Sequence, residues 1–287
     1  DVGGLMGFIF KANALTKYGK TVLSPLTHSR NFIGNMPHMI ANGYFNGNAM
    51  DTNLREWWST AAAGNDLFGV TDEKRRERYR RMVELGVVNY GFEVEIEDMI
   101  RQSGADETLG SFLTRVGRIS RDTSSLTQRV IGKTQQMYSF EDDVFKVIAF
   151  EIEAGRLKKA YPLMKDDEIE AMAAEIVGQT MPNYEMVPEA VLALRRLPIV
   201  GTFPSHTAEM IRTTIGRIRL ARSEMSDSNP EIQKAGRNRM MGLAIMLSLP
   251  SIAAIAFKSL SGISDEEEEA IRRMLPFWNR NSTLLFQ

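Results

Sequence analysis

The 287-residue chain has no cysteine and only three histidines. Disulfides and thiolate metal sites are therefore excluded, and imidazole chemistry is confined to His28, His38 and His206. An excess of one charge is also missing: 35 Lys and Arg face 36 Asp and Glu, so the net charge of −1 gives no overall attraction to nucleic acid or anionic membrane. Hydrophobic residues at 43% and charged residues at 25% are typical of a globular protein.

Runs that alternate polar and apolar residues are scarce, whereas apolar residues recur at intervals of three and four along most of the chain. This spacing predicts an all-α protein, an irregular multi-helix bundle. We expect two helical subdomains, residues 1–178 and 205–287, joined by a Pro-rich crossover at 179–204. The crossover prolines are Pro182, Pro188, Pro198 and Pro204.

Capping residues mark several expected helix boundaries. Ser24 and Pro25 should open one helix, with a kink at Pro37. Asp72 should cap a strongly charged helix that ends at Gly86, and Ser139 should cap a later one. Further helices are expected at 5–18, 166–177 (ended by Gly178), 205–222, 230–248, 251–261 and 264–275.

No catalytic, cofactor-binding or metal-binding residue is predicted, and we expect a protein that is not an enzyme. His28 and His38 are ten residues apart, which does not put two ligands on one helix face, and His206 with Glu209 is best explained as a local helix-start contact. Gly132-Lys133-Thr134 has no glycine at position 127 and therefore lacks the phosphate-binding pattern GxxxxGK[ST].

A cluster of carboxylates follows the expected cap at Ser139. Its members are Glu141, Asp142, Asp143, Glu151 and Glu153. Di-iron helical bundles need Glu-x-x-His pairs, and none is present. We therefore interpret these carboxylates as helix N-terminal charges and solvated faces.

Arginines recur at helical spacing in residues 74–81, 115–129 and 212–222. Such stripes can follow a phosphate backbone without reading its sequence. The possible nucleic-acid contacts are Arg212, Arg217, Arg219 and Arg222. The alternative is a solvated helix face with ion pairs between neighbouring turns.

Met240 to Phe257 forms an 18-residue stretch without a charge, between Arg239 and Lys258. As one helix it would extend roughly 27 Å at about 1.5 Å per residue, close to a hydrocarbon core of about 30 Å. Because Pro250 lies within it, the favoured interpretation is two buried core helices that meet at a proline turn. Conditional membrane insertion and a protein interface are the alternatives.

The segment SPLTHSRNFIGN at 24–35 resembles the phrase NP-x-TH-x-RNF-x-x-N of polyvalent and internal ejection proteins of tailed bacteriophages, with Ser24 in place of Asn. Further similar phrases, in the same order, extend the resemblance over most of residues 20–215. The residues that carry it as a structural signature are Pro25, Thr27, His28, Arg30, Asn31, Phe32, Asp142, Asp143, Phe145 and Lys146. In this signature we expect polar groups to fix a helix start and Phe32 to anchor it in the core.

The resemblance implies a non-enzymatic helical module of a phage internal virion protein, packaged near the portal inside the capsid and delivered into the host cell with the genome. Implied partners are the portal or other virion proteins, phage DNA and sister copies in a homo-oligomer. Two alternatives stay open: a non-catalytic region of a giant virion-packaged RNA polymerase, and a membrane-active, channel-forming ejection protein that uses residues 240–257.

Overall fold

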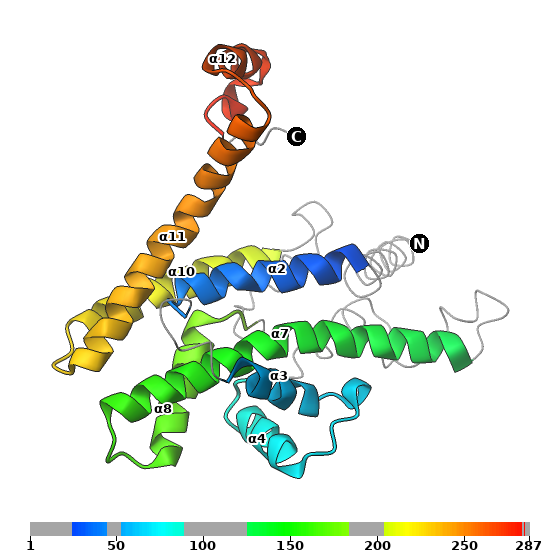
Figure 1. Cartoon of the computed structure of the whole chain (residues 1–287), viewed down its shortest axis with the longest axis vertical. Coiled ribbons are helices and arrows are strands. Elements are labelled where there is room, and N and C mark those ends of the chain that lie inside the picture. The colour runs from blue at the N-terminus through cyan, green and yellow to red at the C-terminus, as the bar shows by residue number, and fades with distance from the viewer. Residues whose placement is uncertain (1–24, 45–52, 89–124, 184–203, 283, 285–287) are drawn as a thin grey trace, which may run out of the picture.

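The computed structural model describes residues 25–44, 53–88, 125–183, 204–282 and 284, and all regular structure in these ranges is helical (Figure 1). The predicted all-α fold is confirmed. The helices are α2 (Pro25–Ala41), α3 (Leu54–Ala63), η1 (Asp66–Phe68), α4 (Glu73–Glu84), α7 (Ser125–Ala160), α8 (Asp166–Thr180), α10 (Pro204–Met225), α11 (Pro230–Leu260), α12 (Asp265–Met274) and η3 (Phe277–Asn279). The helix expected at 5–18 and most of the Pro-rich crossover lie outside the described residues.

Local capping chemistry sets several helix ends where the sequence predicts them. The side chains of Asp72, Asn229 and Ser264 each accept a hydrogen bond from a backbone N–H in the first turn of α4, α11 and α12. In α12, Glu267 bonds back to the backbone N–H of Ser264, which completes a capping box. Gly86 follows α4 with φ 71°, a conformation that glycine adopts without steric cost.

Three boundaries predicted from single residues are wrong, because Ser139, Gly178 and Pro250 all lie inside helices. Ser139 is a good cap only if the preceding residues leave the helix, and here α7 has already begun at Ser125. Pro250 removes one backbone hydrogen bond, but helix-forming residues on both sides carry α11 through it from Pro230 to Leu260. The expected proline turn between two helices is therefore absent.

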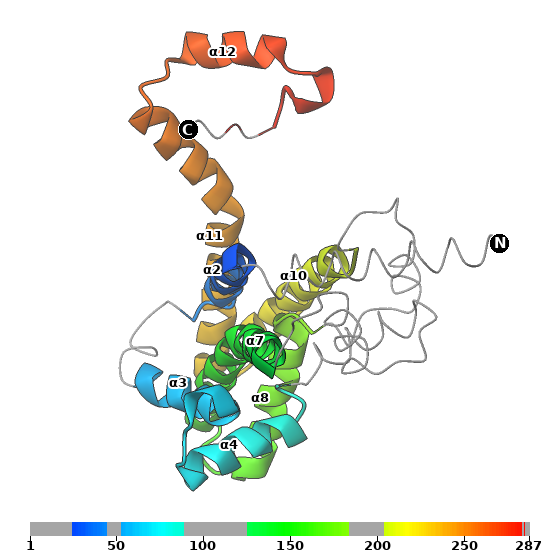
Figure 2. The ribbon, with the colours of Figure 1, turned by 90° about the vertical axis from the view of Figure 1, so that its right-hand side faces the viewer.

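Helix α7 is the centre of the bundle, and α2, α3, α8 and α11 all pack against it (Figures 1 and 2). Its buried apolar side chains between positions 140 and 157 are Phe140, Val144, Phe145, Val147, Ile148, Ala149, Phe150, Ile152 and Leu157. These residues point in every direction around the helix, since a helix has about 3.6 residues per turn. Helix α7 consequently has little solvated face in this region.

An aromatic cluster joins α2, α3 and η1 to α7. The ring of Phe32 lies 5.0 Å from that of Phe145 and 6.3 Å from that of Trp58, measured between centroids. The ring of Phe140 lies 5.1 Å from that of Trp58 and 4.5 Å from that of Phe68. Tilted and edge-on pairs at these distances favour packing beyond the area they bury.

Helices on the two sides of the crossover pack against each other. Helices α10 and α11 form an antiparallel pair, and this pair contacts α8, α2 and α7. Ile232 of α11 belongs to the same buried apolar cluster as the core residues of α7. The division into two subdomains stays a prediction, and the described helices of both share one core.

Only the first part of α11 is packed in the bundle. Beyond it, the helix continues outward as a single rod, and α12 lies across its outer end (Figures 1 and 2). We call residues 244–282, from α11 past the last buried residue Leu243 through α12 and η3, the arm.

Candidate functional site

The apolar side chains of the arm are exposed to solvent rather than packed in a core. Leu247 is 66% exposed, Ile255 68% and Leu260 84%. Within the 18-residue uncharged stretch only 11% is buried, and its mean hydropathy is 2.1. The prediction that this stretch forms buried core helices is therefore wrong: no neighbouring helix among the described residues covers it.

The exposed apolar residues surround the helix instead of forming one stripe. The large exposed apolar residues of this part of α11 are Met240, Met241, Ile245, Leu247, Ile252, Ile255, Phe257 and Leu260. At about 100° per residue, these positions are distributed around the whole circumference. A helix that docks on one partner needs one apolar side, whereas a helix that is apolar all round is typical of a large core or a membrane span. Helix α11 is also the one described helix long and apolar enough to cross a membrane.

A buried ionic cluster fixes the inner end of the arm. Arg239, with 0% exposure, lies one residue before the uncharged stretch. Its guanidinium donates from Nη2 to Glu153 Oε1 of α7 (2.7 Å) and from Nε to Glu224 Oε2 of α10 (2.8 Å). It also donates from Nη1 to Asn42 Oδ1 (3.2 Å), next to the end of α2. One side chain thus ties α11 to the three helices around it.

The charges of the cluster compensate one another. Burial alone would raise the pKa of Glu153, but Arg239 and Arg156 outweigh that effect and lower it, so Glu153 is ionised. Burial keeps the pKa of Glu224 above its usual value although Arg239 opposes the shift. The guanidinium of Arg156 lies over the ring of Tyr44, 5.0 Å from its centroid, and donates to the carbonyl of Gly43 (2.9 Å).

Two glycines allow close packing at the same place. A Cβ on Gly242 would lie 2.0 Å from the carbonyl oxygen of Ile40, and a Cβ on Gly236 would lie 2.8 Å from that of Ala221. Only glycine permits α11 to approach α2 and α10 so closely. The inner end of the arm is therefore rigidly held by both charge and shape.

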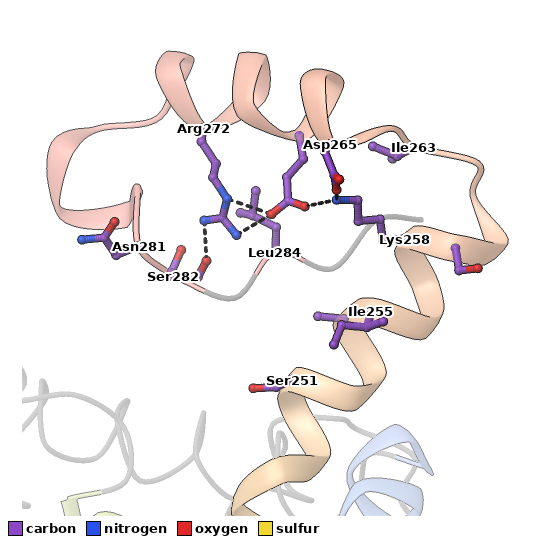
Figure 3. Close-up of a pocket in the computed structure, with 12 residues that line it drawn as sticks. Ser251, Ile255, Lys258, Ile263, Asp265, Arg272, Asn281, Ser282 and Leu284 are labelled. Carbon is purple, nitrogen blue, oxygen red and sulfur yellow. Dashed lines mark hydrogen bonds and ion pairs between the residues drawn. The ribbon is translucent and has the colours of Figure 1, made fainter.

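The outer end of the arm has its own ion pairs, around a cavity of about 550 Å³ between α11, α12 and the chain after η3 (Figure 3). Lys258 pairs with Asp265 and with Glu268 (2.6 Å), and Glu268 also accepts from Arg272 (2.8 Å from Nε). Arg272 Nη1 donates in addition to the carbonyl of Ser282 (2.9 Å). The two cations are thus occupied by carboxylates, and the cavity offers no uncompensated charge to an anionic ligand.

The phage-like signature connects helices where its side chains are described. Phe32 packs against Phe145, Lys146 pairs with Asp142 (2.6 Å), and Asp143 accepts a hydrogen bond from the hydroxyl of Tyr79 (2.8 Å). The signature residues Pro25, Thr27, His28, Arg30 and Asn31 lie in the first turns of α2. The roles expected for their side chains stay predictions, because those side chains lie outside the described ones.

Three of the five carboxylates after Ser139 are buried and two are partly exposed, which corrects their interpretation as helix N-terminal charges and solvated faces. Glu141, Asp143 and Glu153 are all buried, because α7 is enclosed by other helices. Burial raises the pKa of Asp143 to about 7, although Lys146 and the Tyr79 hydroxyl oppose the shift. Glu151 faces α4 and accepts from Nε of Arg78 (2.8 Å). None of the described His, Asp and Glu residues forms a group that could hold a metal ion.

Of the four arginines predicted to contact nucleic acid, only Arg219 and Arg222 are exposed. Arg217 is 1% exposed; it contacts the ring nitrogen Nδ1 of His38 and donates to the carbonyl of Thr180. Burial lowers the pKa of Arg217 to about 10. The prediction is wrong for Arg217, because a buried guanidinium cannot reach a phosphate.

Arg212 is also engaged within the protein. Its guanidinium binds the carboxylate of Glu209, which is buried, and donates to the carbonyls of Gly178 (2.9 Å) and Met181 (3.1 Å) at the end of α8. Arg212 and Arg217 therefore fasten α10 to α8. The remaining two exposed arginines are too few for a stripe.

The arginines of α4 form ion pairs with carboxylates of other helices as well as with carboxylates of α4 itself. Arg78 binds Glu151 of α7 and Glu170 of α8, and Arg81 binds Glu170 and Asp167 of α8. These pairs secure α4 against the bundle.

Comparisons with protein-family models, with curated proteins and with solved structures gave no match. Sequence reasoning missed Arg239, Glu153 and Glu224 as a unit, because a contact between residues 86 apart leaves no local pattern. It did find the uncharged stretch that follows Arg239, and it assigned that stretch the wrong surroundings.

Proposed function

We propose that the chain is a non-enzymatic helical module of an internal virion protein of a tailed bacteriophage, and that it assists genome delivery by binding a lipid membrane through its arm. The observation that carries the membrane role is the exposed apolar surface of α11 between Ala244 and Phe257. The phage assignment is supported by the phrase at 24–35 and by the signature residues Asp142, Asp143, Phe145 and Lys146. The packaging near the portal and the passage into the host cell are parts of the same proposal.

Lipid suits this surface better than water or a single protein partner does. Each apolar Å² removed from water contributes about 25 cal/mol, so the exposed side chains of α11 strongly favour an apolar surrounding. Because these side chains lie all around the helix, one flat protein surface would leave part of them in water. Acyl chains cover every side. Pro250 is compatible with this, since proline is tolerated in membrane helices.

In this proposal the helical bundle is the base that holds the arm in position. The bundle holds α11 through Arg239 and the close approach at Gly242, so the arm extends from a fixed base. The alternative of a non-catalytic region in a virion-packaged RNA polymerase shares this architecture. Reading the flanking parts of the parent polypeptide for polymerase motifs separates the two.

Vesicle flotation tests the membrane role. Wild-type protein mixed with phosphatidylethanolamine–phosphatidylglycerol vesicles should float with the lipid in a density gradient. Leu247→Asp places a charge near the middle of the uncharged stretch, which should cost about 3 kcal/mol and weaken binding roughly a hundredfold. The matched control is Leu163→Glu: Leu163 is 99% exposed in the loop before α8, and its replacement should leave flotation unchanged.

Other outcomes would overturn the membrane proposal. If wild-type protein stays out of the lipid fraction and instead forms a defined oligomer in sedimentation, the arm is an interface between copies of this chain. If Leu247→Asp floats as well as wild type, the apolar surface is not what binds. The phage assignment is tested separately, by mass spectrometry of purified virions and by the position of the chain in a density map of the particle.

A further inference from the structure

We infer that the arm crosses the bilayer once, with the helical bundle on one side and α12 with the chain after it on the other. This inference rests on the proposed membrane role and adds a topology to it. The two alternatives for a membrane-bound arm are a helix that lies flat in the interface and a helix that spans.

The distribution of apolar side chains decides between these arrangements. A helix that lies flat needs one apolar side toward the acyl chains and one strongly polar side toward water. Leu247, Phe257 and Ile252 lie on different sides of α11, and all three are exposed. In the flat arrangement at least one of them would face water. A spanning helix places all of them in hydrocarbon.

The length of the free helix fits a span. From Ala244, the first residue past the buried Leu243, to Leu260 the helix has 17 residues, or roughly 25 Å at about 1.5 Å per residue. A span needs about 17 to 25 residues, so the arm lies at the short end of that range. A slightly thinned bilayer accommodates this difference at modest cost. The only charge within these residues is Lys258, near the outer end, where a lysine side chain reaches the headgroup layer.

Polar structure at both ends of the exposed helix limits how far it can enter the hydrocarbon. At the inner end the bundle, fixed to α11 by Arg239, is too polar and too large to follow the arm into hydrocarbon. At the outer end α11 ends at Leu260, Gly262 follows with φ 66°, and α12 begins with five consecutive acidic residues, Asp265 to Glu269. Figure 2 shows α12 lying across the outer end of α11, as a helix in the far headgroup layer would.

The outer end also carries apolar side chains suited to that layer. Ile271, Met274 and Phe277 recur every three residues and are 38%, 87% and 74% exposed. Ile271 and Met274 lie in α12 and Phe277 in η3 after it, and an amphipathic helix with apolar residues beside many charges favours the boundary between headgroups and acyl chains. The ion pairs of Lys258 with Asp265 and Glu268 hold α12 at the end of α11 in this position.

The absence of cysteine makes the topology directly measurable, because each introduced cysteine is the only thiol in the protein. Two exposed positions serve as reporters: Ala270→Cys in α12 and, as the matched control, Ser223→Cys in α10 of the bundle. Each variant is added to preformed vesicles, floated, and treated with a membrane-impermeant maleimide before and after detergent. Spanning predicts that Cys at 223 reacts at once, whereas Cys at 270 is protected at least tenfold until detergent is added.

The outcomes separate the topology from the membrane role. If both variants float and both cysteines react without detergent, the arm lies on one side and the topology is overturned, while the membrane role stands. If neither variant floats, the membrane role itself fails. A second readout uses Leu247→Cys labelled with a fluorophore: depth-dependent quenching should place the fluorophore at the bilayer centre if the arm spans, and a shallow position contradicts the span.

Discussion

Arg239 and Glu153 join the arm to the centre of the bundle through an ion pair of 2.7 Å in which neither side chain is exposed by more than 2%. Glu224 completes the site on the other side of the guanidinium. Removing water from such charges is costly, and each compensates the others only while all are present. The pair therefore makes the position of α11 sensitive to the loss of any one partner.

Arg239→Met should lower the free energy of unfolding by about 3–5 kcal/mol, because Glu224 would stay buried without its cation and Glu153 would keep only Arg156. Urea unfolding measures this loss. Arg237→Met, at an exposed position two residues earlier, should change stability by no more than about 0.5 kcal/mol.

The stability loss of Arg239→Met should depend on pH. Without Arg239 the pKa of Glu153, which is lowered in the wild type, should rise above its unfolded value. A folded carboxyl with a raised pKa binds more protons than the unfolded one, so stability increases as pH falls. The deficit of Arg239→Met should therefore be smaller at pH 5 than at pH 8. An equal deficit at both values would mean that lost packing, and not uncompensated charge, causes the destabilisation.

A close approach at Gly242 gives a second prediction about the base of the arm. Gly242→Ala would bring a Cβ to 2.0 Å from the carbonyl oxygen of Ile40, so α11 or α2 must shift. We expect a loss of about 1–3 kcal/mol, as for other overpacked sites. Gly155→Ala in α7 is the matched control: nothing lies within 4 Å of its Cβ position, and the change should stabilise the helix by about 0.5–1 kcal/mol. Similar values for both variants would contradict the close approach.

The contact between the two parts of the phage-like signature, Phe32 in the phrase at 24–35 and Phe145 in α7, can be tested by a double-mutant cycle. The rings of Phe32 and Phe145 lie 5.0 Å apart, and such pairs contribute about 0.5–1.5 kcal/mol beyond the area they bury. We expect Phe32→Leu and Phe145→Leu to show a coupling energy of that size in chemical unfolding. Purely additive losses would show that the two phrases are not energetically connected.

Features of this fold that depend on neighbouring residues could be predicted from the sequence, and those that depend on distant residues could not. The caps at Asp72, Asn229 and Ser264 act within one helical turn, so the residue types at these positions predict where the helices begin. Ser139 has the same chemistry, but α7 had begun fourteen residues earlier and no cap was needed. Local signals therefore show where a helix can begin, and the preceding chain decides whether it does.

The environment of the arm, on which the proposed function depends, also could not be predicted from local sequence. An uncharged stretch such as Met240–Phe257 is compatible with a buried core and with a membrane span, because both surroundings are apolar. What separates them is whether other helices cover the stretch, and that depends on where the neighbouring helices end: α2 ends beside Gly242, and α10 ends beside Gly236. For the same reason the burial of Arg217 and Glu153 could not be predicted from helical spacing. The spacing shows which residues share a face of one helix, but it does not show which other helix covers that face.

Asp143 provides the last prediction, a stability change with pH that comes from burial. Its pKa is raised by burial from an ordinary value near 4 to about 7, so the folded protein binds a proton that the unfolded chain releases. Wild-type stability should therefore fall as pH rises from about 4 to about 7, and the ionised carboxylate should cost up to roughly 4 kcal/mol above that range.

Asp143→Asn keeps an oxygen that can accept from the Tyr79 hydroxyl and removes the titration. The variant should unfold at higher urea than wild type at pH 8 and at nearly the same urea at pH 5. Asp142→Asn is the contrasting control: it takes the carboxylate away from Lys146, whose side chain is 8% exposed, and should destabilise the protein at pH 8. If Asp143→Asn destabilises at pH 8 as Asp142→Asn does, the Tyr79 hydrogen bond and Lys146 outweigh the cost of burying the ionised carboxylate, and burial does not raise the pKa of Asp143.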